Sequence, residues 1–118
     1  METSLTNELI REVYPIDEHE ECYVAIQKET GRVMWFGKEL NDRRSEIDKH
    51  NVANKCKQWA STHNYSVMSG WEMTHWGGAY RVDVYRNSNN ILFSMSTVET
   101  EPDAIFQACE WIRKKLKG

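Results

Sequence analysis

The sequence predicts an α+β fold, a two-layer sandwich in which an antiparallel sheet of three to five strands carries helices on one face. Two observations predict this class. Three segments between residues 66 and 98 alternate apolar and polar side chains, as strands do when one face is buried and the other solvated. Helical apolar periodicity precedes and follows them, at 52–63 and 100–116. The predicted order over the whole chain is α-ββ-α-βββ-α.

The first helix is predicted over Thr3–Tyr14, with Ser4 or Thr3 as its N-cap and Pro15 ending it. One face of this helix is apolar and consists of Leu5, Leu9, Ile10 and Val13.

A β-hairpin is predicted next, from Cys22–Lys28 and Arg32–Gly37. The intervening Glu29-Thr30-Gly31 is turn material, with glycine available for a positive φ. Asp42–Lys49 is predicted to be a charged connector. The second helix follows, with an apolar face of Val52, Cys56, Trp59 and His63 and with Asn64 as its terminator.

Three strands are predicted at Ser66–Thr74, Ala79–Arg86 and Ile91–Val98, joined by turns at residues 75–78 and 87–90. The first strand places Val67, Ser69, Trp71 and Met73 on one face. The second places Tyr80, Val82 and Val84 inward against Arg81, Asp83 and Tyr85 outward. The third places Ile91, Phe93 and Met95 on one side.

The last helix has the most complete set of signals. Thr100 is a favourable N-cap, Asp103 is its reciprocal partner, and Pro102 is tolerated in the first turn. A continuous apolar stripe follows, made of Ile105, Ala108, Cys109, Ile112 and Leu116.

Length and composition predict one domain over residues 1–118, with a helix-and-hairpin elaboration at 1–45 and a core at 46–118. A mean hydropathy of -0.72 without a long apolar run argues against a membrane span. Met1–Ile10 lacks signal-peptide features, so the expected compartment is the cytoplasm. The net charge of -3 disfavours binding of a nucleic acid, and three unpaired cysteines indicate reduced thiols.

The junction before the last helix reads Glu99-Thr100-Glu101-Pro102-Asp103-Ala104-Ile105-Phe106-Gln107-Ala108. This motif resembles the hallmark of the phage ABA-sandwich family, small proteins of phages and prophages, with Glu99 standing where Asp is usual. The resemblance covers about residues 48–116 and implies the helix, three-strand and helix order. It implies an accessory protein that antagonises host defence by binding a host protein or sequestering a nucleotide signal. It transfers no catalytic residue.

Aromatic and basic side chains around the predicted turn at 75–78 are the candidate binding residues. Arginine forms bidentate contacts with phosphate, and indole or phenol rings stack on bases. The set consists of Trp71, His75, Trp76, Arg81, Tyr85 and Arg86. The alternative interpretation has Trp71 and Trp76 sealing the sheet edge while the arginines pair with Asp83 and Glu72.

The remaining aromatic and sulfur side chains are predicted to be structural. Trp59 and Trp111 are assigned to the core or an interface, with Trp35 left undecided. Four methionines, Met34, Met68, Met73 and Met95, are predicted to fill gaps in the core.

No catalytic signature, phosphate loop or cofactor motif is present in the sequence, and no cofactor is expected. A zinc set drawn from His19, Cys22, Cys56 and His63 matches no known spacing, so no metal is expected. A Cys–His nucleophile would need a proximity that the sequence does not show.

Three functions therefore remain open. The first is a non-enzymatic binding protein for a host protein or small nucleotide, expected to form a homo-oligomer because a small core gains from association. The second is a small enzyme acting on nucleotides or nucleic acid, with a site assembled across the fold. The third is a nucleic-acid binder through Arg81, Arg86 and the basic tail, which the net charge disfavours.

Overall fold

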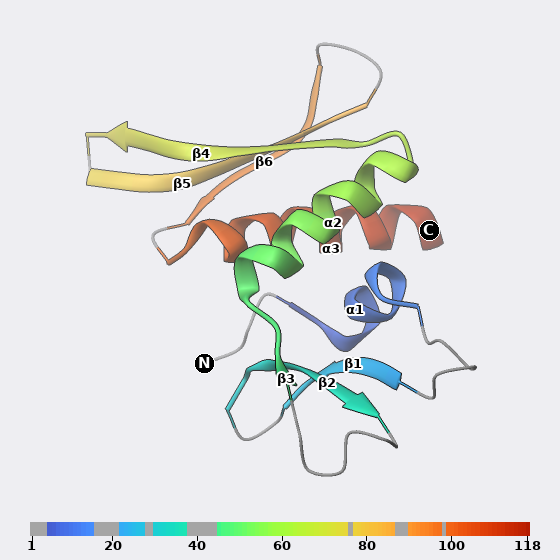
Figure 1. The fold of residues 1–118 in the computed structure, drawn as a ribbon. Helices are drawn as coiled ribbons and strands as arrows, with labels where there is room; N and C mark the ends of the chain where they lie inside the picture. Colours follow the sequence, from blue (N-terminus) through green and yellow to red (C-terminus); the bar gives the residue numbers. More distant parts are fainter. Residues whose placement is uncertain are drawn as a thin grey trace.

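The computed structural model describes residues 5–15, 22–27, 30–37, 45–75, 77–86, 90–97 and 99–118. These residues form an α+β fold in the predicted order α-ββ-α-βββ-α, with one additional short strand (Figure 1). The elements are α1 (Asn7–Val13), β1 (Cys22–Ile26), β2 (Val33–Gly37), β3 (Ser45–Glu46), α2 (Lys49–Thr62), β4 (Ser66–Thr74), β5 (Gly77–Tyr85), β6 (Ile91–Thr97) and α3 (Glu101–Lys117).

The strands form two separate antiparallel sheets, ordered β1-β2-β3 and β4-β5-β6. Helix α3 packs against all three strands of the second sheet, and α2 packs beside it against β4. Figure 1 shows α2 and α3 between this sheet and a lower layer formed by α1 and the β1–β2 hairpin. The helices therefore cover one face of the β4-β5-β6 sheet, as predicted. The hairpin does not extend this sheet and packs instead against α1.

The predicted connector at 42–49 contributes the short strand β3. Glu46 and Ser45 pair with Met34 and Trp35 of β2, and the Ile47 N–H donates to the Val33 carbonyl at 2.8 Å. The edge of β2 would otherwise present unpaired backbone groups, which are costly when partly buried. The composition of this segment is hydrophilic and does not predict a strand, because its pairing with β2 is made by backbone groups.

Two helix starts differ from the prediction. Helix α1 is capped by Thr6, whose Oγ1 accepts from the Leu9 N–H at 3.2 Å; Thr3 and Ser4 lie outside the described residues. Helix α2 begins at Lys49, because Asp48 accepts from the His50 N–H at 2.8 Å and adds a turn before the apolar periodicity. Asn64, with φ 67°, ends α2 in the left-handed conformation, as predicted.

The start of α3 has the predicted capping arrangement. Thr100 Oγ1 accepts from the Asp103 N–H at 3.3 Å, and its hydroxyl donates to Asp103 Oδ2 at 2.5 Å. The apolar stripe is buried as far as Ile112. Leu116, in the last turn of α3, is 45% exposed, contrary to the prediction that the stripe is apolar and packed along its whole length.

We expect Thr100→Ala to lower the free energy of unfolding by about 1 kcal/mol, the usual cost of losing an N-cap side chain. Urea denaturation followed by circular dichroism measures this change. Ser61→Ala, on the exposed face of α2, is the control; an equal loss in both variants would contradict a specific capping role.

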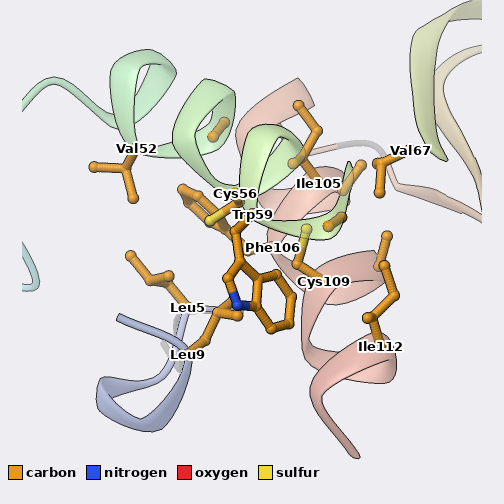
Figure 2. Packing of buried hydrophobic residues seen from close by; sticks show 14 of the residues in the cluster. Leu5, Leu9, Val52, Cys56, Trp59, Val67, Ile105, Phe106, Cys109 and Ile112 are labelled. Carbon is orange, nitrogen blue, oxygen red and sulfur yellow. The ribbon is translucent and has the colours of Figure 1, made fainter. Parts of the chain in front are cut away.

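A single hydrophobic cluster joins the two halves of the chain. Leu9 and Ile10 from α1, together with Leu5 just before it, belong to the same cluster as the buried faces of α2 and α3. Val24 and Val33 from the hairpin belong to it as well. Figure 2 shows the side chains of the central part of this cluster gathered between α1, α2 and α3.

The buried cysteines occupy the α2–α3 interface. Cys56 and Cys109 are fully buried and free, which fits the prediction that they act as small hydrophobes. The adjacent Cys56 thiol, together with burial, raises the pKa of the Cys109 thiol far above its ordinary value. The Cys109 thiol therefore stays protonated and is not an available nucleophile.

The tryptophans and methionines divide between core and surface. Trp59 is buried, and Trp111 is half-buried and stacks on Phe93 with 5.3 Å between ring centroids. Trp35 is 38% exposed and meets Tyr14 edge to face. Among the methionines, Met34 and Met95 contact the core as predicted, whereas Met68 and Met73 are exposed.

Candidate partner-binding surface

The turn between β4 and β5 is shorter than predicted. Gly77 and Gly78 belong to β5, where they pair with Thr74 and Met73, so only residues 75 and 76 connect the strands. Gly77 has φ 115°, a value that favours glycine and allows the strand to begin immediately. The paired glycines make the hairpin longer than the sequence analysis predicts.

The end of this hairpin extends beyond the helices. Ser69 donates to Glu101 Oε1 at 2.7 Å, which marks where the first turn of α3 meets β4. Figure 1 shows the strands continuing past the start of α3 toward their shared turn. On the helix-facing side of β4, Val67 is buried, whereas Trp71 and Met73 are 58% and 72% exposed. The predicted strand face is therefore correct, but its outer half is uncovered.

The exposed indole of Trp71 packs against two residues of β5, Tyr80 and Gly78. Its ring meets Tyr80 edge to face, with 4.9 Å between centroids. A Cβ added at Gly78 would overlap the six-membered ring of Trp71, so only glycine leaves room for this position. We call Trp71, Met73, Gly78 and Tyr80 the hairpin-end surface. The sequence pattern predicts Met73 in the core and Gly78 in the turn, so neither is among the predicted binding residues.

The opposite face of the same strands carries an ion-pair cluster. Arg81 Nε lies 3.1 Å from Asp83 Oδ1, and Arg81 Nη1 lies 3.5 Å from Glu72 Oε1. Ser94 donates to Asp83 Oδ1 at 2.6 Å. The hydrogen bond and the charge of Asp83, followed by the charge of Glu72, raise the pKa of Arg81. This confirms one part of the predicted alternative, the pairing of Arg81 with these two carboxylates. Arg86, for which the alternative predicts the same partners, lies against Tyr65 instead.

A shallow hollow of about 340 Å³ lies beside the ion-pair cluster. Gly70 leaves its centre open, since a Cβ there would meet nothing within 4 Å. The hollow is lined by Met68, Ser69, Gly70, Trp71, Glu72, Arg81, Asp83 and Tyr85. Two carboxylates face one guanidinium here, so the local charge disfavours a phosphate group.

Three of the six predicted binding residues, Trp71, Arg81 and Tyr85, line this hollow, although their side chains do not all point to one face of the sheet. Trp71 and Tyr80 share one face of the sheet, whereas Arg81 and Tyr85 alternate with Tyr80 and so lie on the other. His75 is exposed at the turn, and Trp76 lies outside the described residues. Arg86 follows the far end of β5, where its guanidinium lies 5.1 Å from the Tyr65 ring centroid.

The residues weighed as zinc ligands are dispersed. Cys56 is in the core beside Cys109, and His63 packs edge to face on Trp59 at 5.2 Å. His19 and the side chain of Cys22 lie outside the described part of the chain. Within that part, no three His, Cys, Asp or Glu side chains are grouped to hold a metal ion.

Comparison with known proteins gives no relative: no family model, no curated protein and no solved structure matches the chain. The resemblance to the phage ABA-sandwich family therefore stays a prediction. None of the helices in the described residues combines the length and the apolar character that crossing a membrane requires.

Proposed function

We propose that this protein is a non-enzymatic binding protein that docks a partner protein on its hairpin-end surface. The observation that carries the proposal is the exposure of Trp71 and Met73, side by side on one face of a hairpin that extends past its covering helices. Contiguous apolar side chains of this kind on a small domain typically mark an interaction surface.

The arrangement of Trp71 supports a protein partner. Tryptophan is enriched among the residues that dominate binding energy at protein interfaces. Because Gly78 and Tyr80 hold the indole in place, little side-chain entropy is lost when a partner covers it. Met73, which is flexible and polarisable, adapts to the rim of an apolar pocket.

A nucleotide ligand has less support than a protein partner. The predicted phosphate contact, Arg81, is already paired with Asp83 and Glu72, and Arg86 lies against Tyr65 at the far end of β5. On the resemblance to the phage family, the expected partner is a protein of the bacterial host.

Affinity capture from a bacterial lysate, quantified by mass spectrometry, tests the proposal. The bait proteins are the wild-type chain, Trp71→Ala, Met73→Ala and Gly78→Ala; the last displaces the indole without removing it. We expect one host protein to be captured by the wild type and depleted with all three variants. With that protein purified, Trp71→Ala should weaken the affinity roughly 30-fold, the effect of losing about 2 kcal/mol at a central anchor.

Met68→Ala is the matched control, since Met68 is an equally exposed methionine of β4 on the opposite face. It should leave capture unchanged. A captured protein lost equally with Met68→Ala, or retained with Trp71→Ala, would refute the docking surface. Binding of a cyclic dinucleotide by the purified chain would favour nucleotide sequestration, and turnover of that compound would favour the enzyme.

A further inference from the structure

A second feature, separate from the hairpin-end surface, is the free edge of β6. Among the described residues, β6 pairs with β5 only, so its other side presents unpaired backbone N–H and C=O groups. The strand, Ile91–Thr97, contains no charged residue and no proline. Edge strands in proteins that stay monomeric are usually protected by lysine, proline, β-bulges or covering loops. The register of β6 with β5 shifts once, at Leu92 near the start of the strand, and Phe93–Thr97 continue without a further shift. By contrast, β4, the other edge of this sheet, contains Glu72 and a central glycine, Gly70.

The hydrophobic core is incomplete beside this edge. Phe93 and Met95 face the helices from β6 but are only partly buried, and so is Trp111, which stacks on Phe93. Leu92, the extra residue where the register with β5 shifts, is 46% exposed. The surface where β6 meets α3 thus combines unpaired backbone groups with partly exposed apolar side chains. Burying these side chains further would stabilise the fold.

We propose that β6 pairs antiparallel with β6 of a second copy of this chain, about a two-fold axis at Ser94. Full overlap of the seven residues requires this centre, because residue 94 is the middle of the strand. The two sheets then form one six-stranded sheet with the helices of both copies on the same face. Such an interface is isologous, and the pairing is closed rather than filamentous.

The residues that this register places opposite one another are chemically compatible. Phe93 faces Met95 of the partner subunit on the helix side, a favourable aromatic–thioether pair. Ser94, which lies on the other side with Asp83, faces its own counterpart. No pair brings like charges together, which is the usual obstacle to pairing identical strands.

Size-exclusion chromatography with light scattering of the full chain gives the first measurement. We expect a mass twice the 13.9 kDa of one chain, decreasing toward one chain on dilution. Leu92→Lys should give a monomer, since lysine on an edge strand blocks pairing. Met68→Lys, which places the same charge on the other edge strand, should remain dimeric. Circular dichroism and urea unfolding confirm that both variants are folded.

Disulfide trapping then locates the axis. Ser94→Cys and Met68→Cys are prepared separately with Cys22 replaced by serine, and each is treated with an added thiol oxidant. Cross-linked dimer should form in Ser94→Cys and not in Met68→Cys, because only residue 94 meets its own counterpart at cross-strand distance. A monomer at all concentrations would overturn the proposal. So would a dimer that cross-links at residue 68, or at neither position, because a different surface would then form it.

Discussion

Replacing Phe106 by alanine is expected to lower the free energy of unfolding by about 3–5 kcal/mol. Phe106 is 1% exposed and is the largest fully buried side chain among the described residues. It projects from α3 into the cluster shared by α1, α2 and α3 (Figure 2). Truncation removes apolar surface from the core and leaves a cavity that neighbouring helices fill only in part. Such a loss is a large fraction of the 5–15 kcal/mol typical of whole domains.

Urea unfolding, followed by circular dichroism, measures this loss. Leu116→Ala is the matched control on the same helix, because Leu116 is 45% exposed in the last turn. It should cost well under about 1 kcal/mol, as surface substitutions usually do. Equal losses in the two variants would contradict the placement of Phe106 at the centre of the core.

The order of elements was predictable because the local signals agree with the tertiary structure. Alternation along β5 placed Val82 and Val84 inward, and both are fully buried. Thr100 and Asp103 form the predicted cap because both partners lie within one helical turn. Signals of this kind depend on residues close in the sequence, so they can be interpreted without knowing the rest of the fold.

The candidate site was less predictable because it depends on how much of the β4-β5-β6 sheet the helices cover. Periodicity assigned Val67, Trp71 and Met73 to one face, but it gives no information on how far α3 extends along that face. The exposure of Trp71 and Met73, which lie beyond the contact between Ser69 and Glu101, shows that both are outside the covered part. The prediction that Met73 fills a gap in the core is therefore wrong, because its side chain is exposed.

The separation of the six predicted binding residues has a similar origin. Proximity in sequence suggested one cluster, whereas strand alternation places Trp71 and Arg81 on opposite faces of the sheet. The pair Gly77-Gly78 also misled the prediction of the turn. Gly-Gly is typical of a turn, but here both glycines belong to β5. Gly78 leaves the space that the Trp71 ring occupies. This contact depends on cross-strand geometry, which the composition of the segment does not show.

Replacing Leu9 by alanine is expected to lower the free energy of unfolding by about 3–5 kcal/mol, and to do so for the whole chain in one transition. Leu9 is fully buried, on an N-terminal helix that the sequence assigns to an elaboration of the fold. In the structure it belongs to the same hydrophobic cluster as Val52 and Trp59 of α2 (Figure 2). A shared core makes the unfolding of α1 and of the β4-β5-β6 unit cooperative.

Two probes distinguish this outcome from independent unfolding of the first 45 residues. Circular dichroism follows all helices, whereas tryptophan fluorescence is dominated by rings outside that segment, because only Trp35 lies within it. In Leu9→Ala the two urea transitions should coincide and shift together. Arg11→Ala, on the exposed face of α1, should leave both transitions near those of the wild type. A fluorescence transition that stays at the wild-type midpoint in Leu9→Ala would mean that residues 46–118 fold independently of α1.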